Sequence, residues 1–367
     1  MKITKVSARL IEREMPGKLW NPRHRWAKKQ IVLAFVETDD GLAGVGEAWT
    51  SGGSPRALIA VIEDDLAPLL LGQDPHFSTR FAAEAKATTE LSNRSGIVAA
   101  ALSALDIALW DLIGKATRTP LYKLLGAHSD RVRCYASAGL YGEGKTPDDL
   151  GAELKGYVDQ GFSAVKMKVG GAPLKEDVAR VAAAREAIGP DVQLMVDALY
   201  NLTSAEALAL ARAIDRYDIH FFEAPVSAYD VAGQAEVHTR GPIAVCGNET
   251  LAWADSFRDL ILANAVHFVQ FDPAICGGIG EGRRIADLAR AFHRPCTLHA
   301  SSSSVLMAAC LHLAAACANC ASVEYHMLHQ WLWDLEPEGT FAVEPGGFVR
   351  PPAGPGLGLA LAPDHLD

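Results

Sequence analysis

The spacing of hydrophobic and polar residues changes along this chain. The changes divide it into two regions, each with its own regular spacing, and an irregular tail. The opening "MKITKVSARLIERE" alternates like a strand. "QIVLAFVE" and "LAGVGEAW" predict an antiparallel hairpin, because Asp39-Asp40-Gly41 between them suits a tight turn. From about residue 55 to 126, apolar residues recur every three or four positions, most clearly in "GIVAAALSALDIALWDLIG", which predicts helices. We therefore expect residues 1–128 to form an α+β domain.

After about residue 130, short β-rich runs alternate with amphipathic helical stretches. Helix starts between them carry capping signals, including Thr146-Pro147 and Thr203 to Glu206. Parallel strands need crossover connections, and eight of them close a sheet, so residues 129–328 predict a (β/α)7β TIM-like barrel. The glycine- and proline-rich residues 329–367 are too irregular for another unit, and we expect them to return to the first domain. The predicted strands are 132–138, 163–169, 192–198, 219–225, 243–249, 266–272, 295–300 and 321–327.

Composition narrows the class of protein. The chain has 367 residues, of which 49% are hydrophobic and 21% charged, as in a soluble enzyme-sized protein. Its net charge is −10 and no lysine or arginine block occurs, which argues against a nucleic-acid partner. The longest apolar run, 305–318, contains His312 and is too short to span a bilayer, and the N-terminus lacks an apolar signal core. We expect a cytoplasmic protein without a membrane partner.

The cysteines and one glycine-rich stretch could indicate disulfides, a zinc site or nicotinamide binding, but their spacing argues against each. Seven cysteines, an odd number in a long chain, favour reduced thiols over a disulfide framework. Cys317 and Cys320 have CxxC spacing, but no second pair at zinc spacing follows them, and we expect them to pack. "GGIGEG" at 277–282 lacks glycines at the GxGxxG offsets, which argues against nicotinamide binding.

One polar residue recurs at each predicted strand end. The intervals range from 23 residues, between Glu249 and Asp272, to 29 residues, between Lys168 and Asp197. Active sites of such barrels lie at the carboxyl ends of the strands. The spacing therefore predicts that these side chains surround one site: Lys168, Asp197, Glu223, Glu249, Asp272, His299 and Glu324.

Three of these residues suit a metal ion. Asp197, Glu223 and Glu249 follow consecutive strands, which lie roughly 5 Å apart in a sheet. Three converging carboxylates need a cation, and oxygen donors alone suit Mg²⁺ better than zinc. We expect one Mg²⁺ per subunit. The alternative is that they are separate solvated acids in loops.

Two lysines share one strand in "SAVKMKVGG". Lys166 and Lys168 are two residues apart, so their side chains point to the same face. Neighbouring ammonium groups in a buried strand repel each other unless anions compensate them. We accordingly expect Lys166→Met to relieve repulsion and to leave the protein no less stable. The alternative is that both lysines are exposed charges on an edge strand.

In chain order, "KMKVG", "VDA", "FFEAP", "GNE", "FDPAICGG" and "LHASSSS" resemble the enolase superfamily, specifically its mandelate racemase-like subgroup. The resemblance covers nearly the whole chain and implies a capping domain before the barrel. It implies Mg²⁺ ligands at Asp197, Glu223 and Glu249. It further implies a symmetric homo-oligomer and the following site roles: Lys168 as base with Lys166 beside it, a His299/Asp272 dyad, and Glu324 hydrogen-bonded to the substrate carboxylate.

This set of residues suits removal of a proton α to a carboxylate. The product is an enediolate, whose negative charge Mg²⁺ and lysine cations offset. Asp272 would orient the ring of His299 and raise its basicity. Muconate-cycloisomerase and dipeptide-epimerase relatives place a lysine on the sixth strand, where this chain has Asp272, which favours the lysine and histidine pair. His326 and His329 lack such a partner, and we expect them to be loop residues.

If the lysine and the histidine lie on opposite faces of the substrate, two reactions are possible. Protonation of a β-hydroxyl leaving group gives a dehydratase acting on a sugar acid, which we expect, and return of a proton to the carbanion gives a racemase or epimerase of a 2-hydroxy acid. A catalytically silent metal-binding scaffold is the third hypothesis. The loop 20–26 favours a sugar acid, because its residues could bind hydroxyls or a distal carboxylate when the capping domain closes. Its candidate substrate-binding residues are Trp20, Arg23, His24 and Arg25.

One position departs from the family pattern. The subgroup often has asparagine two residues after the first metal ligand, whereas this chain has Leu199 followed by Tyr200. We expect that this polar contact to the substrate is either missing or supplied by Asn201.

Overall fold

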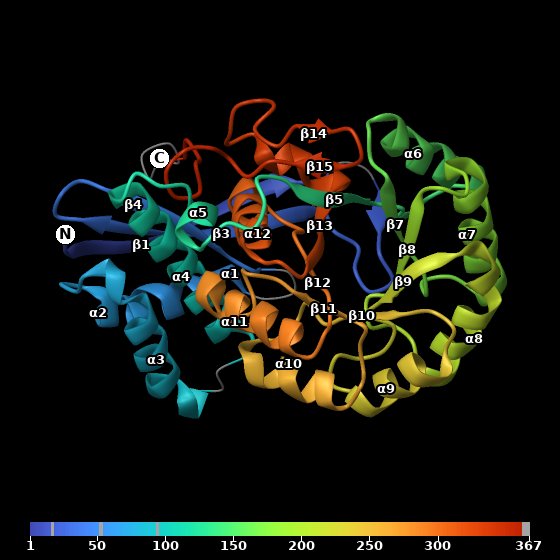
Figure 1. The fold of residues 1–367 in the computed structure, drawn as a ribbon, viewed down its shortest axis with the longest axis horizontal. Helices are drawn as coiled ribbons and strands as arrows, with labels where there is room; N and C mark the ends of the chain where they lie inside the picture. Colours follow the sequence, from blue (N-terminus) through green and yellow to red (C-terminus); the bar gives the residue numbers. More distant parts are fainter. Residues whose placement is uncertain (16–17, 51–53, 93–94, 362–367) are drawn as a thin grey trace.

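The computed structural model describes residues 1–367 except 16–17, 51–53, 93–94 and 362–367. An N-terminal α+β domain lies beside a closed barrel in Figure 1. This arrangement confirms the fold class that the sequence predicts.

The N-terminal domain is built on an antiparallel sheet with strand order β1-β3-β4. The predicted hairpin forms, since β3 (Lys28–Thr38) pairs with β4 (Ala43–Ala48), and β1 (Ile3–Glu14) pairs with the other edge of β3. Short helices α1 (Pro55–Ala60), α2 (Ala67–Leu70) and α3 (Ser78–Thr88) surround this sheet and lead to the long helix α4 (Ile97–Ala116).

Helix α4 is the central helix of this domain. By length and hydropathy alone it could cross a membrane, but 89% of its apolar window is buried inside the protein. It packs on β4 so closely that a side chain on Gly44 or Gly46 would collide with the backbone of α4. A helix buried on most of its surface is apolar all round, which explains its composition.

The barrel consists of eight parallel strands, and pairing of β13 with β5 closes it. Each strand is short. The carboxyl ends of all eight strands lie at the same end of the barrel, where the pocket described below is found. The strands, all within fully described sequence, are β5 (Val132–Ser137), β7 (Ala164–Lys168), β8 (Gln193–Asp197), β9 (Ile219–Glu223), β10 (Val245–Gly247), β11 (Phe268–Phe271), β12 (Cys296–Leu298) and β13 (Cys320–His326).

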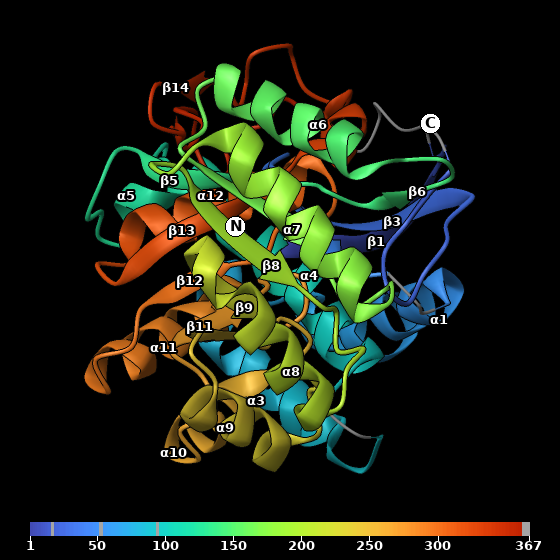
Figure 2. The same cartoon turned by 90° about the vertical axis from the view of Figure 1, so that its right-hand side faces the viewer.

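Helices cover the outside of the barrel, as Figure 2 shows for α7, α8 and α9. The predicted caps form: Thr146 and Asp149 make a capping box at α6, and Thr203 and Glu206 make one at α8. The helices are α6 (Pro147–Asp159), α7 (Leu174–Ile188), α8 (Ser204–Ile214), α9 (Val231–Arg240), α10 (Trp253–Leu262), α11 (Gly278–Ala291) and α12 (Ser304–Ala316).

Buried acids of the N-terminal domain join it to the barrel. Glu47 on β4 accepts hydrogen bonds from the hydroxyl of Ser303 and from the backbone N–H of Leu306, at the start of α12. Asp106 on α4 accepts one from the N–H of Gly280, in the first turn of α11. Carboxylates at helix N-termini satisfy free N–H groups and interact favourably with the helix dipole.

The tail contacts both domains. Strand β15 (Phe348–Val349) pairs with β5 and with β14 (Val343–Glu344), outside the barrel. Farther on, the N–H of Leu357 donates to Asp111 of α4 at 2.8 Å, and the carbonyl of Gly356 accepts from Leu121 of α5 (Leu121–Leu124). The tail therefore links the first barrel strand to the N-terminal domain.

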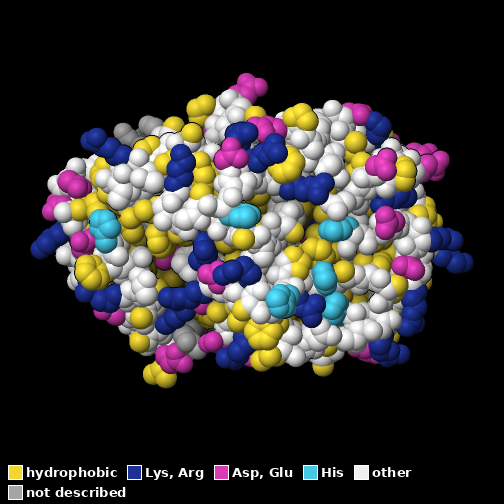
Figure 3. Space-filling view, in the orientation of Figure 1, with side chains coloured by type: hydrophobic (Ala, Val, Ile, Leu, Met, Phe, Trp, Pro, Cys, Tyr) yellow, Lys and Arg dark blue, Asp and Glu magenta, His cyan; other side chains and the backbone are white. Residues whose placement is uncertain are grey.

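Basic and acidic side chains are interspersed over the face in Figure 3. The described part of this face carries no continuous basic surface, in agreement with the absence of lysine or arginine blocks from the sequence. All seven cysteines are free thiols, and six of them are buried.

Candidate active site

A cavity of about 230 Å³ lies at the carboxyl ends of the barrel strands. Barrel residues form its floor and walls, and the loop before β3 and the ends of β3 and β4 form its roof. Ligand pockets for drug-sized molecules measure roughly 300–1,000 Å³, so this cavity suits a smaller molecule. Its lining residues include Asn21, Arg23, His24, Trp26, Lys29, Trp49, Leu140, Lys168, Leu199, Tyr200, Glu249, Thr250, Ile275, His299, Ser301, Glu324, His326 and His329.

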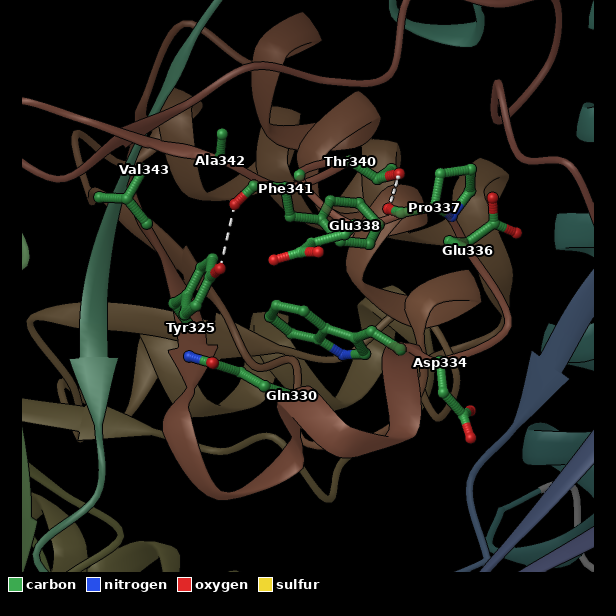
Figure 4. A pocket seen from close by; sticks show the side chains of 12 residues that line it. Tyr325, Gln330, Asp334, Glu336, Pro337, Glu338, Thr340, Phe341, Ala342 and Val343 are labelled. Carbon is green, nitrogen blue, oxygen red and sulfur yellow. Dashed lines mark hydrogen bonds between the residues drawn. The ribbon is translucent and has the colours of Figure 1, made fainter.

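A larger cavity, of about 380 Å³, lies elsewhere, beside the 3-10 helix η5 (Met327–Trp333) and the tail. Figure 4 shows Tyr325, Glu338 and Phe341 around it, with the Tyr325 hydroxyl donating to the carbonyl of Phe341. None of the residues predicted at the strand ends lines this cavity. Size alone would therefore point to the wrong site, and the chemistry identifies the smaller cavity.

The three predicted metal-ligating acids lie on neighbouring strands and are buried. Asp197 ends β8 directly opposite Glu223 at the end of β9, and Glu249 follows β10. Burial raises the pKa of Glu223 to about 8; Lys166 opposes this rise, whereas the charges of Asp197 and Glu249 add to it. Burial also raises the pKa of Glu249. Of the three, only Glu249 lines the cavity. Neighbouring buried carboxylates require positive charge to stay ionised.

Each of these acids is engaged by another side chain in this structure. Lys168 pairs with Asp197, Lys166 with Glu223, and the hydroxyl of Tyr200 donates to Glu249. Among the described residues, no three acidic, histidine or cysteine side chains converge closely enough to hold a metal ion in this arrangement. The donors nevertheless fit Mg²⁺, because three carboxylates supply hard oxygen ligands from adjacent strand ends. Binding would require these side chains to turn toward one another.

The two strand-β7 lysines are both buried, at 0% exposure for Lys166 and 6% for Lys168, so they are not edge-strand charges. Nearby anions compensate them. Lys166 Nζ lies 2.7 Å from Glu223, 3.0 Å from Glu324 and 3.7 Å from Asp197. Burial alone would lower the pKa of Lys166, but these carboxylates raise it well above its ordinary value. The repulsion expected from the sequence is therefore outweighed by ion pairing.

His299 and Asp272 form the predicted pair. Nδ1 of His299 lies 2.6 Å from Oδ2 of Asp272, and Nε2 lies 3.5 Å from Oε2 of Glu324. Burial favours the neutral ring, but Glu324 and Asp272 outweigh it and raise the pKa of His299 to about 9. The indole of Trp49 meets the imidazole edge-on, with ring centroids 5.3 Å apart. The ring is thus held as an imidazolium in a fixed orientation.

Glu324 connects the two halves of the site. Its carboxylate lies between Lys166 and His299 and accepts from the backbone N–H of Ala300. These positive neighbours overcome the effect of burial and lower its pKa well below the ordinary value. As an anion it can orient the lysine and the imidazolium, whereas hydrogen bonding to a substrate carboxylate would require it to take a proton.

Only part of the predicted substrate loop reaches the cavity. Arg23 and His24 line the roof, and the Arg23 guanidinium donates to the carbonyl of Tyr200. Trp20 and Arg25 do not line it: the guanidinium of Arg25 stacks 3.9 Å from the ring centroid of Trp20, which in turn stacks on Tyr141. Packing within the loop thus directs these two side chains away from the substrate position.

The region after Asp197 differs from the expectation for Asn201. Asn201 is exposed, donates to the carbonyl of Gly170, and does not line the cavity. Leu199 and Tyr200 line it instead, with φ of 45° and 62°. The left-handed backbone turns Tyr200 inward, where its hydroxyl reaches Glu249. Tyr200, and not Asn201, is therefore a polar side chain of this segment that lines the cavity.

Two lining histidines were misjudged from the sequence, and Lys29 and Trp49 are among the lining residues that it missed. His326 and His329 are not loop residues: His326 ends β13, His329 lies in η5, and both are buried. Their rings stack with centroids 3.9 Å apart. Lys29 and Trp49 come from the roof strands. A lysine next to another lysine in a strand, and a tryptophan after a hairpin, carry no signal in the sequence alone that distinguishes them from surface and core residues.

Comparisons with known proteins agree with the fold. Residues 8–126 match the mandelate racemase / muconate lactonizing enzyme N-terminal domain, and residues 149–365 match the enolase C-terminal domain-like family. Arabinonate dehydratase of Saccharolobus solfataricus is 34% identical over 90% of this chain and 88% of its own. L-talarate/galactarate dehydratase of Salmonella typhimurium is 34% identical over 78% of this chain and 70% of its own.

Among solved structures, a racemase from Streptomyces coelicolor A3(2) with bound magnesium superimposes with a TM-score of 0.91 at 30% identity. The match covers 99% of this chain and 98% of that one. Both domains are thus accounted for by one family. The chain belongs to the mandelate racemase subgroup of the enolase superfamily.

Proposed function

We propose that this protein is a Mg²⁺-dependent sugar-acid dehydratase that converts an aldonate or aldarate into a 2-keto-3-deoxy acid. The observation that carries the proposal is that His299, which is paired with buried Asp272, lines the same small cavity as Lys168. The two dehydratase relatives support the same reaction class. One Mg²⁺ per subunit, held by Asp197, Glu223 and Glu249, would supply positive charge to the enediolate oxygens.

The side chains can perform an elimination with balanced proton transfers. Lys168 takes the proton from C2 on its Nζ, and the electron pair of the C2–H bond moves into the enediolate. The imidazolium of His299 gives its proton to the hydroxyl on C3 as the C3–O bond breaks, which releases water and leaves an enol. The enol then loses the proton of its C2 hydroxyl and takes a proton at C3, which gives the 2-keto acid. Lys166 offsets negative charge throughout.

The charge state of His299 favours elimination over racemisation. An imidazolium with a pKa of about 9 is ready to donate a proton at neutral pH, which a leaving hydroxyl needs. A racemase needs the same ring as a base for one enantiomer. Racemisation or epimerisation of a 2-hydroxy acid remains the second candidate, and the superposition on a solved racemase is what favours it.

The decisive experiment is a screen of purified protein with Mg²⁺ against a library of aldonic and aldaric acids, read out as 2-keto acid formation. Turnover of at least one acid supports the proposal. Exchange of the α-proton with solvent deuterium, without any 2-keto acid, would contradict dehydration and support the racemase. Neither exchange nor elimination on any acid would favour the silent scaffold.

A further inference from the structure

We propose that Lys29, His326 and His329 form a second anion-binding corner of the cavity, which selects acids that carry a distal carboxylate. The preferred substrates would then be aldarates rather than aldonates, which end in a hydroxymethyl group. This inference rests on the proposed function, because it specifies the substrate class of the same site.

Lys29 is a buried cation without a carboxylate partner in the described part of the chain. Its side chain is 7% exposed, it donates to the carbonyl of Ser301 at 2.9 Å, and its ammonium lies 4.7 Å from the ring centroid of Trp49. An ammonium has three donors, and a buried charge is costly without a partner of opposite charge. Burial lowers the pKa of Lys29 to about 8, while Glu47, Asp272 and Glu324 act from a distance in the opposite direction. Lys29 therefore stays charged at neutral pH and can bind an anion.

The histidine pair provides further polar groups beside Lys29. Nδ1 of His329 lies 3.3 Å from the hydroxyl of Ser301, whose carbonyl binds Lys29. Nδ1 of His326 is buried and has no hydrogen-bond partner among the described residues. Burial lowers the pKa of His326 to about 3, so its ring is neutral and each nitrogen can donate or accept. The His326 ring lines the cavity, and the described residues leave the hydrogen-bonding capacity of this nitrogen unused.

The charges of the roof favour an anion over a hydroxyl. The residues that the first 50 positions contribute to the cavity include Arg23 and Lys29 but no acid. Arg23 is tied to the carbonyl of Tyr200, after β8, whereas Lys29 is tied to Ser301, after β12. These two cations therefore lie over different walls. A hydroxymethyl group at the Lys29 corner would leave the ammonium unpaired, and a carboxylate would neutralise it.

The test compares Lys29→Met with Lys28→Met, a matched control whose exposed side chain pairs with Glu12. Steady-state kinetics are measured with aldarate and aldonate pairs of the same chain length and configuration. We expect wild-type protein to prefer the aldarate, and Lys29→Met to lose roughly 10² in kcat/KM on the aldarate but less than about 5-fold on the aldonate. His326→Phe, which keeps an aromatic ring, should reduce the same preference by a smaller factor.

Three results would overturn the inference: equal losses on both acids, no loss in Lys29→Met, or loss of the aldarate preference in Arg23→Met instead. Calorimetric titration of Lys168→Met protein with Mg²⁺ and the same acids separates binding from catalysis. Tighter binding of the dicarboxylate there, abolished by adding Lys29→Met, supports the corner even if no acid is turned over. In that case the proposed function fails and the inference stands.

Discussion

Nδ1 of His299 lies 2.6 Å from Oδ2 of Asp272, and both side chains are buried. This contact fixes which ring nitrogen faces the cavity and contributes to the raised pKa of about 9. We expect Asp272→Asn to lower this pKa, because an amide cannot stabilise the imidazolium by charge. The pH above which elimination declines should therefore fall, with a loss of activity smaller than that of His299→Asn. A pH–rate profile with an unchanged alkaline limb would contradict this role of Asp272.

Lys168 and His299 should act on opposite faces of the substrate carbon. Lys168→Met is expected to stop exchange of the α-proton from one configuration, whereas His299→Asn should spare that exchange and prevent loss of the β-hydroxyl. The measurement is deuterium incorporation at C2, followed by NMR, for both epimers of a substrate found in the screen. If each single variant lost exchange equally for both epimers, a site with two faces would be excluded.

The three carboxylates should make activity depend on a divalent cation. Chelation is expected to abolish turnover and Mg²⁺ to restore it, and Glu223→Gln should weaken metal binding, because an amide is a poorer ligand than a carboxylate. Glu236→Gln, on the exposed face of α9, is the matched control. Calorimetric Mg²⁺ titration checks the affinity, and full activity in excess chelator would exclude a role for the metal.

Much of this architecture could be read from the sequence because burial sets the period of apolar residues. The strands end one or two residues before the positions that the pattern predicts, and Asp197, Glu223 and Asp272 fall at one end of the barrel. Contacts between segments that are distant in the chain could not be predicted from the sequence. Strand β3 is apolar on both faces, so its pattern cannot show that Lys29 points inward while Lys28 is exposed. The buried position of His329 likewise depends on the path of the chain after the last strand.

Lys166→Met should destabilise the metal-free protein, which reverses the sequence-based expectation. The ammonium of Lys166 contacts three buried carboxylates, and its loss would leave Glu223 and Glu324 without this partner. Breaking a buried ion pair by removing one partner costs roughly 3–5 kcal/mol. Thermal melting in chelator should show a lower Tm than wild type, whereas Lys155→Met, at an exposed helical pair, should change it little. A Tm equal to or above that of wild type would show that repulsion from Lys168 dominates.

The interface between the two domains should carry a pH-dependent contribution from Asp106. Burial raises its pKa to about 7, although the N–H groups of Gly280 and Ile279 act in the opposite direction. Between about pH 4 and pH 7 the folded protein keeps a proton that the unfolded chain has released, so stability falls as pH rises through this window.

The variant Asp106→Asn tests this prediction, because an amide cannot titrate. The Tm of wild type minus the Tm of this variant should therefore fall as the pH rises from 5 to 7 and change little from 7 to 8, while groups common to both proteins cancel. Asp255→Asn, at an exposed position in α10, is the control and should show no such trend. A difference that stays constant from pH 5 to pH 8 would show that Asp106 is already ionised in the folded protein throughout.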